Sequence, residues 1–425
     1  MHRIARRLGV LAAAFLAAAC DRGPAPGRAT SRDSAGITIV ENAGPAWSRG
    51  AGWKVLGNPL VDIGGKRGTP PYELDQVRGP VRLSDDHLAI ANASTNEIRF
   101  YDAAGKHLRS SGRAGNGPGE YSTIGGIWLG AGDSLLVDDV LIRRITLLDR
   151  DGNVGRSFSL GGKVGTVVPT NGRVELSVLL GRFADGTLAG VSQSLGINQQ
   201  RAGVFRDSIT IIRYGPDGGV LDTLGRFPGA EMEELTLKMG GRSTSSPSPV
   251  PLGRQTVAMV DRERLVVAQN NAWELELRGA DGKLRALVRA PLQASRLTAS
   301  DIAAHRKQQV QALEATPIFR NIPQVLKAQI KARAEQAKYP ATLPFFAALL
   351  SDPDGNVWAE EASPPTQKAK RFDVVDSTGR WLGTVEFPAD FRPTFIASDA
   401  VYGVWKDEED VEHVRGYPLR KLQAR

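Results

Sequence analysis

Four polar residues recur at one position of a repeated pattern and are the best candidates for binding a ligand. Counting ten residues back from each turn acid or its equivalent leads to Asn92, Asp139 and Gln269. Glu360 falls at the matching place after its own strand. All four would end the second strand of a repeat, so we expect them on one face of the fold, around the mouth of a central channel. Such a ring of amides and carboxylates can bind a polar ligand or one metal ion. The alternative is that these strand ends are polar only because they meet water.

No catalytic set stands out elsewhere, and we assign no catalytic residue, no metal ligand and no cofactor. The histidines form no His-x-x-x-His pair, and there is no Gly-x-Ser-x-Gly nucleophile elbow. Segments 149–153 and 352–356 resemble the opening of a calcium loop, but neither continues with the remaining oxygen ligands, so both are predicted to be hairpin turns. The glycine-rich stretch 112–121 lacks the ending of a phosphate loop and is predicted to link two repeats.

The elements that would position these residues repeat about six times along the chain. Each copy runs from a turn acid through two short apolar strands to a turn glycine, most clearly over 86–105 and 133–152. Apolar residues alternate with a period of two, and Gly105 and Gly152 are expected to supply the positive φ of tight hairpins. Such a unit cannot bury its apolar face alone, so its neighbours must stack on it. We therefore predict an all-β fold, a six-bladed β-propeller. Weaker copies start at Asp185, Glu263, Asp354 and Asp399.

The two ends of the repeat array are expected to meet. The last repeat, from about Arg392, has only three clear strands before the C-terminus. An N-terminal strand within 53–63 would complete it and remove a free sheet edge. The predicted propeller domain spans 36–425.

Two stretches interrupt the repeat pattern of this domain. Segment 229–252 is rich in Ser, Pro and Gly and is predicted to be a long loop. Segment 297–339 is predicted to be a helical insertion between late blades, because Thr298 and Asp301 have the spacing of a capping box and helical periodicity follows them. The insertion would cover one face of the ring, offer basic residues to a partner, or simply pack in solvent.

The N-terminus has the pattern of an export signal. Residues 1–19 combine basic residues with an apolar run that is too short to cross a bilayer. The run ends at Cys20, the only cysteine of the chain, in a pattern similar to the lipobox of bacterial lipoproteins. We expect lipidation there, the alternative being ordinary cleavage that leaves an idle thiol. Residues 20–35 are predicted to be a flexible tether. The protein would thus be exported and anchored by lipid in the cell envelope, facing the periplasm or the exterior.

The charge pattern argues against nucleic acid as a partner. The formal net charge is +8, and it falls once the arginines of the signal leave. Charges of both signs are interspersed, and few aromatic residues accompany the basic ones. The expected partners are the membrane, through the lipid anchor, and a protein, peptide or glycan.

Three stretches carry a resemblance to a known family. Residues 36–42, 115–121 and 354–358 resemble bacterial six-bladed, NHL-repeat-like propeller proteins that are exported as lipoproteins and have no defined function. The resemblance implies the fold. Related six-bladed propellers include metal-dependent lactonases and lyases, but no catalytic pattern of theirs transfers to this chain.

Two functional hypotheses follow. The first is a non-enzymatic, envelope-anchored binding or scaffold protein that holds a protein, peptide or glycan on the face with the interblade loops. The second is a metal-dependent hydrolase or lyase, with one metal held by Asp139 and Glu360 together with the amides Asn92 and Gln269. Convergence of these four side chains on one point would favour the second hypothesis, and a spread arrangement the first.

Overall fold

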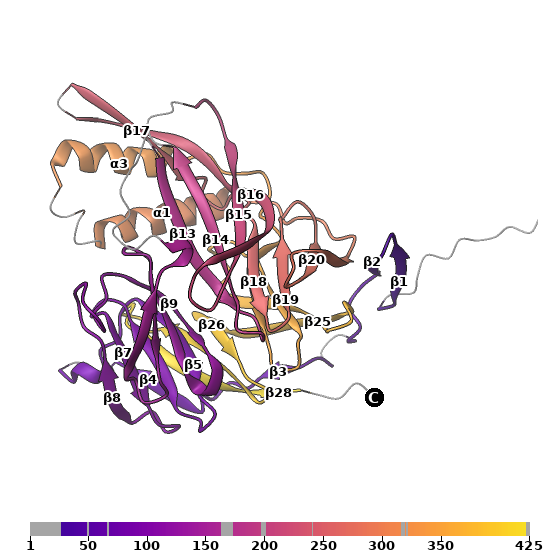
Figure 1. Cartoon of the computed structure of the whole chain (residues 1–425). Coiled ribbons are helices and arrows are strands. Elements are labelled where there is room, and N and C mark those ends of the chain that lie inside the picture. The colour runs from indigo at the N-terminus through magenta and orange to yellow at the C-terminus, as the bar shows by residue number, and fades with distance from the viewer. Residues whose placement is uncertain are drawn as a thin grey trace, which may run out of the picture.

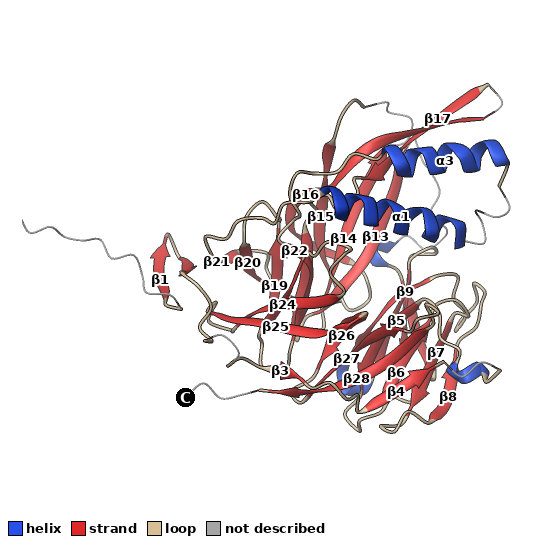
Figure 2. Cartoon of the chain, turned by 180° about the vertical axis from the view of Figure 1, so that it is seen from behind, coloured by secondary structure: helices blue, strands red, loops and turns tan. Residues whose placement is uncertain are grey.

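The computed structural model describes residues 27–421, apart from 49–50, 66–67, 163–172, 197–200, 240, 316–318 and 320–321. Within these residues the chain is mostly β, with six small sheets in a propeller-like arrangement and two α-helices at one side (Figures 1 and 2). None of the helices in this part of the chain is long and apolar enough to cross a membrane. The predicted signal segment 1–19 and Cys20 lie outside the described residues.

Sheets 1 and 2 are four-stranded and antiparallel, with the strand orders β5-β6-β7-β8 and β12-β11-β10-β9. Gly105 and Gly152, in the turns before the outermost strands, have φ values of +83° and +80°, which confirms their predicted role in hairpins. The strands are β5 (Val77–Arg82), β6 (Leu88–Asn92), β7 (Glu97–Tyr101), β8 (His107–Ser111), β9 (Ile124–Leu129), β10 (Leu135–Asp139), β11 (Arg144–Leu148) and β12 (Val154–Phe158).

Sheet 3 has five strands in sequence order, β13 to β17, and sheet 4 has the order β1-β2-β21-β20-β19-β18. The strands of sheet 3 are β13 (Arg173–Arg182), β14 (Leu188–Gly196), β15 (Phe205–Tyr214), β16 (Val220–Met239) and β17 (Arg242–Pro249). Those of sheet 4 are β1 (Ala29–Ser34), β2 (Ile37–Asn42), β18 (Val257–Asp261), β19 (Arg264–Ala268), β20 (Glu274–Gly279) and β21 (Leu284–Arg289).

Sheet 5 has the order β22-β23-β24-β25, and sheet 6 joins β26, β27 and β28 to β3 and β4 from the N-terminal part of the chain. The strands of sheet 5 are β22 (Phe346–Ser351), β23 (Val357–Glu361), β24 (Ala369–Val375) and β25 (Trp381–Ala389). Those of sheet 6 are β26 (Phe391–Ile396), β27 (Ala400–Lys406), β28 (Glu412–Arg420), β3 (Lys54–Val55) and β4 (Val61–Gly64). Short 3-10 turns lie at Pro70–Tyr72, Ala131–Asp133 and Leu160–Gly162.

The hydrophobic core lies between neighbouring sheets. Ile98 and Phe100 of sheet 1, for example, pack in one cluster with Ile124 and Leu135 of sheet 2. The first strands of the six sheets also touch in order: β5 contacts β9, β9 contacts β13, β13 contacts β18, β18 contacts β22, β22 contacts β26, and β26 contacts β5. Each sheet therefore buries its apolar faces against two neighbours, which is why a single repeat cannot fold alone.

The N-terminal strap, the described residues 29–48 and 51–64, runs along the outer edges of three sheets. Strand β2 pairs in parallel with β21 of sheet 4, the backbone N–H groups of Ala46 and Trp47 donate to carbonyls of β25 in sheet 5, and β4 pairs with β28 of sheet 6. The prediction for 20–35 was therefore partly wrong, because Ala29–Ser34 form β1 rather than a flexible tether. Pairing with β2 provides hydrogen-bond partners for the backbone N–H and C=O groups of this segment. Composition alone had predicted the segment to be unstructured.

The predicted helical insertion is confirmed. Helix α1 (Ala299–Ala315) and helix α3 (Gln324–Gln336) pack on each other, and α3 contacts β16. The capping box forms as expected, because the hydroxyl of Thr298 accepts a hydrogen bond from the N–H of Asp301 and the Asp301 carboxylate accepts one from the N–H of Thr298. The Thr366 hydroxyl also donates to Asp301, which fastens the start of α1 to sheet 5.

The predicted loop over 229–252 was wrong. Strands β16 and β17 pair from Met232–Pro249 to Met239–Arg242 and form a long hairpin that projects beside α3 (Figure 1). Gln329 of α3 exchanges hydrogen bonds with the backbone of Lys238, and Arg333 forms an ion pair with Glu233. These contacts hold β16, and pairing with β16 in turn stabilises β17, a Ser- and Pro-rich strand that local propensity disfavours.

Candidate functional site

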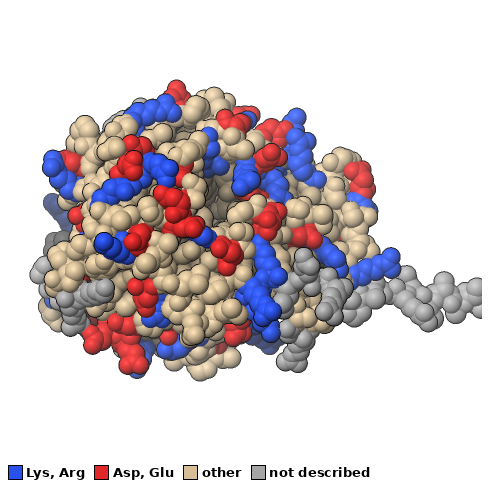
Figure 3. Space-filling model, turned by 90° about the horizontal axis from the view of Figure 1, so that it is seen from below, with Lys and Arg blue, Asp and Glu red and all other residues tan. Residues whose placement is uncertain are grey.

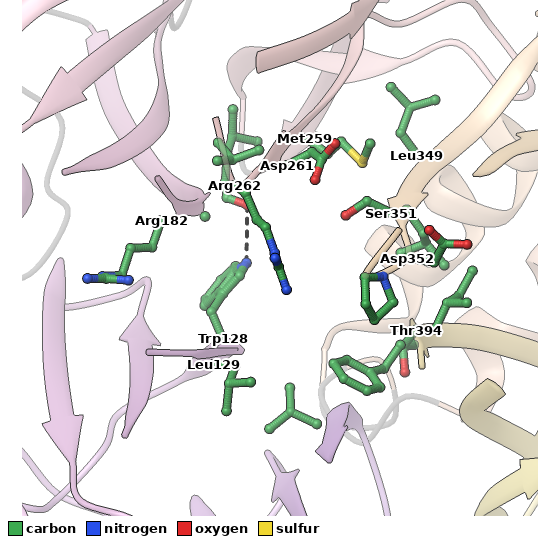
Figure 4. A pocket seen from close by; sticks show the side chains of 18 of the residues that line it. Trp128, Leu129, Arg182, Met259, Asp261, Arg262, Leu349, Ser351, Asp352 and Thr394 are labelled. Carbon is green, nitrogen blue, oxygen red and sulfur yellow. Dashed lines mark hydrogen bonds between the residues drawn. The ribbon is translucent and has the colours of Figure 1, made fainter. Parts of the chain in front are cut away.

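A cavity of about 450 Å³ lies where the six first strands meet. Every sheet contributes lining residues from the C-terminal end of its first strand, including Leu129, Arg182, Met259, Leu349 and Thr394 (Figure 4). This end of the strands leads into the hairpins between first and second strands. The cavity therefore lies on the face opposite to the one on which the sequence placed the polar ring.

The walls of the central cavity are mostly apolar, with a few polar groups among them. The indole N–H of Trp128 donates to the backbone oxygen of Leu180 at 3.1 Å, which fixes the ring against sheet 3. The hydroxyl of Thr394 donates to the backbone oxygen of Gly79 at 2.9 Å. Ser351 completes the set of hydroxyls in the lining. Apolar walls with few oriented polar groups are typical of sites for small ligands.

The two acidic residues in the lining already have partners. Asp261 forms an ion pair with Arg264. The fully buried side chain of Asp352 accepts hydrogen bonds from Asn356 and Trp358 and pairs with the ammonium of Lys421 at 3.0 Å. Their negative charges are thus neutralised within the protein.

The two arginines in the lining have no acidic partner among the described residues. Arg262 extends into the middle of the cavity, between Trp128 and Ser351, whereas Arg182 lies beyond Trp128 and points away from it (Figure 4). Because the lining acids are paired and a guanidinium is always charged, the cavity carries an excess of positive charge.

Asn92 and Asp139, two of the predicted ligand-binding residues, are fully buried and bind backbone groups of the chain. The side-chain oxygen of Asn92 accepts a hydrogen bond from the N–H of Asp75 at 2.7 Å. The carboxylate of Asp139 accepts hydrogen bonds from the N–H groups of Ser122 and Thr123, at 2.6 and 3.1 Å. Both side chains therefore hold the segment that crosses from one sheet into the next, which is a structural use of polar strand ends.

Gln269 and Glu360, the other two predicted residues, are engaged with side chains. Gln269 donates to the carboxylate of Glu276 at 2.6 Å, and Glu360 forms an ion pair with Lys370 at 2.9 Å. Lys370 lines a second cavity, of about 330 Å³, on the crossing face. Burial lowers the pKa of the nearby Arg392, and the charges of Glu412 and Glu360 act in the opposite direction.

The four predicted residues belong to four different sheets, and the structure pairs each of them with a separate partner. Across the described ranges, no group of three or more His, Cys, Asp or Glu residues is arranged to hold a metal ion. Their assignment as ligand-binding residues stays a prediction.

Both segments that resemble calcium loops are hairpin turns. The carboxylate of Asp149 accepts hydrogen bonds from the N–H groups of Asp151 and Asn153, at 2.9 and 2.8 Å. Asp352 accepts equivalent bonds from Asp354 and Asn356, each at 3.0 Å. The carboxylates thus organise the turn backbone, as Asp commonly does at this position.

A third cavity, of about 380 Å³, lies between sheets 4 and 5 and contains two carboxyl groups. Asp373 is buried and accepts hydrogen bonds from the indoles of Trp273 and Trp381, at 2.9 and 3.2 Å. Burial raises the pKa of Glu361 to about 7, and the charge of Asp373 adds to the increase. Arg371 pairs with Glu361 at 3.3 Å. The two carboxyl groups, Glu361 and Asp373, are thus bound by neighbouring side chains, and neither lines the central cavity.

Charges of both signs are intermixed on the face shown in Figure 3, without a large patch of one sign. Sequence reasoning missed Trp128, Arg262 and Ser351, because it followed the ends of second strands to the crossing face. The available signal was their position at or just beyond the end of a first strand, which the repeat pattern could have supplied for all six units at once.

The comparisons with known proteins concern the fold. No protein-family model matches the chain, and no curated protein matches it. Among solved structures it is similar to a member of the DUF4221 family from Bacteroides vulgatus, with 13% identity, 88% of this chain and 99% of that chain covered, and a TM-score of 0.46. It is also similar to a gluconolactonase from Xanthomonas campestris (14% identity, 82% and 87% covered, TM-score 0.39) and to virginiamycin B lyase from Staphylococcus aureus (9% identity, 87% and 99% covered, TM-score 0.38). At these values the similarities assign no activity to this chain.

Proposed function

We propose that this protein is a non-enzymatic, envelope-anchored binding protein built on a closed, six-bladed β-propeller, and that its ligand binds in the central cavity. The ordered contacts among the six first strands support the ring, and the pairing of β4 with β28 supports its closure by the N-terminal strap. Closure would complete sheet 6 with an outer strand from the N-terminal strap and cover the edge of β28, leaving only the short outer edge that propeller blades keep.

One observation carries the choice of site: all six sheets contribute lining residues to the central cavity. A cavity of about 450 Å³ falls within the range that holds small ligands. The crossing face, with the cavity beside Lys370, is a proposed second surface for a protein, peptide or glycan.

The binding role is preferred to metal-dependent hydrolysis because the four polar residues of the crossing face bind separate partners. A direct test is metal analysis of the purified protein beside the double variant Asp139→Ala/Glu360→Ala. Substoichiometric metal that is equal in both proteins is the expected result. Stoichiometric metal in the wild type that is lost in the double variant would contradict the binding role and favour the hydrolase or lyase.

Binding in the central cavity can be tested with a cavity-filling variant. Ser351→Trp places an indole in the lining and should abolish the thermal shift that small ligands produce in the wild-type protein. Near-UV circular dichroism would verify that the variant is folded. Ligand-induced shifts that persist unchanged in folded Ser351→Trp would show that binding takes place elsewhere.

A further inference from the structure

The backbone of Arg262 is held in place before any ligand arrives. Arg262 occupies the two-residue turn between β18 and β19, with a φ of +35°. Its backbone oxygen accepts a hydrogen bond of 2.6 Å from the N–H of Ala184, which ties the turn to sheet 3. The side chain is exposed and extends into the cavity (Figure 4). A charged group on a fixed backbone loses less entropy when it binds a ligand.

Most of the side chains that line the cavity around this guanidinium are apolar. Ile127, Met259, Leu349 and Phe395 line the cavity, and the indole of Trp128 forms one wall. An inorganic ion such as phosphate would leave these walls in contact with water. An anion with an apolar body would cover them and gain the hydrophobic contribution of their burial.

We propose that the central cavity binds a carboxylate carried on an apolar body, and that Arg262 binds the carboxylate through its planar pair of N–H donors. This inference rests on the proposed function, because it takes the central cavity to be the binding site. A guanidinium and a carboxylate match in geometry and form a bidentate pair. The acids in the lining do not compete for Arg262, since Asp261 and Asp352 are already paired with Arg264 and Lys421.

Three probes of similar shape test the charge requirement. Phenylacetate carries the carboxylate, phenylacetamide is its neutral counterpart, and phenethylamine is cationic. Isothermal titration with the full-length protein should show binding of phenylacetate, with much weaker binding of the amide and the amine. Acetate, which lacks the apolar body, should also bind weakly. The carboxylate could belong to a peptide C-terminus or to a small free acid. An acetylated dipeptide that ends in phenylalanine with a free carboxylate, compared with phenylacetate, distinguishes these two ligands.

Substitutions at Arg262 test its role. Arg262→Gln should weaken phenylacetate binding by about tenfold or more, the usual loss for a hydrogen bond to a charged group. Arg262→Lys keeps the charge but not the paired donors. Its affinity for phenylacetate should therefore lie between those of the wild type and Arg262→Gln. Arg285→Gln is the matched control, since Arg285 is an exposed arginine of the same sheet paired with Asp281. It should bind phenylacetate as the wild type does.

The outcomes separate this inference from the proposed function. Equal binding of phenylacetate and its amide, or unchanged binding by Arg262→Gln, would overturn the role of Arg262. If that happened while Ser351→Trp still abolished binding, the central cavity would remain the binding site. Binding of phenylacetate that Ser351→Trp does not reduce would overturn both. No binding of any probe would overturn the carboxylate inference alone, because the proposed function does not require a carboxylate.

Discussion

The side-chain oxygen of Asn42 accepts a hydrogen bond of 2.9 Å from the backbone N–H of Trp381, 339 residues away in the chain. The side-chain nitrogen of Asn42 donates to the backbone oxygens of Gly379 and Arg289, at 3.1 and 3.3 Å. Arg289 belongs to sheet 4, and Trp381 begins the outer strand of sheet 5. One buried amide therefore joins the N-terminal strap to two sheets.

Replacing Asn42 by alanine should destabilise the protein. The substitution would leave a buried N–H and two backbone oxygens without partners, which costs about 2–4 kcal/mol in the free energy of unfolding. Urea denaturation would measure the loss. Asn58→Ala, at an exposed position of the same strap, should change the free energy by less than about 0.5 kcal/mol. Equal stability of the two variants would show that Asn42 does not fasten the strap.

Gly383→Ala should loosen the strap at a second point. A Cβ atom at Gly383 would lie 2.6 Å from the ring of Trp47, and the φ of +151° disfavours any residue with a side chain. Trp47 would have to leave its place against β25, so proteolysis within the strap should become faster. Gly57→Ala is the control, because a Cβ atom there meets open space. Unchanged proteolysis of Gly383→Ala would mean that Trp47 contributes little to holding the strap.

Asp138 should make the stability of the protein depend on pH. Burial raises its pKa from the ordinary 3.8 to about 7, against the hydrogen bond from the N–H of Leu179, and the charge of Asp139 adds to the increase. The unfolded chain keeps the lower pKa and releases its proton first as the pH rises. The contribution of Asp138 to the free energy of unfolding should therefore fall between about pH 4 and pH 7, by up to about 4 kcal/mol, and then level off.

Asp138→Asn should remove this fall and make the protein more stable than the wild type at pH 8. Urea denaturation at pH 5 and pH 8 would measure the difference. Asp222→Asn, at an exposed position of sheet 3, should keep the pH dependence of the wild type. A wild-type protein whose stability changes no more between these pH values than that of Asp138→Asn would contradict the raised pKa.

Cys20→Ser should release the protein from the membrane. An acyl chain on Cys20 would be the only predicted attachment to the bilayer, and serine cannot be acylated by the same thiol chemistry. Fractionation of the producing cells would place the wild type with membranes and the variant in the soluble fraction. A variant that stays with the membrane fraction would contradict the predicted lipid anchor.

Local signals in the sequence predicted much of the architecture. The alternation of apolar residues placed the strands, the turn acids and glycines placed hairpins such as those at Gly105 and Gly152, and the capping box placed the start of α1. The same reasoning failed for 229–252, because β17 owes its structure to its pairing with β16, which α3 contacts, rather than to its own composition. It also failed for Ala29–Ser34, which become a strand only through β2.

The position of the candidate site could not be derived in the same way. Asn92 and Asp139 occupy the predicted strand ends, but only the folded chain reveals that backbone N–H groups already use their oxygens. Arg262 is one of many arginines in the sequence. Its charge lacks an acidic partner among the described residues because the nearby acids Asp261 and Asp352 are paired with Arg264 and Lys421.

The sequence by itself determined the unit that repeats, because hydrophobic alternation and turn chemistry act over a few residues. Only the tertiary structure decided which faces meet, how the N-terminal strap joins three sheets, and which charges in the central cavity lack a partner. Pairings such as Asn42 with Trp381 connect residues hundreds of positions apart, and their energies depend on burial that no local pattern records.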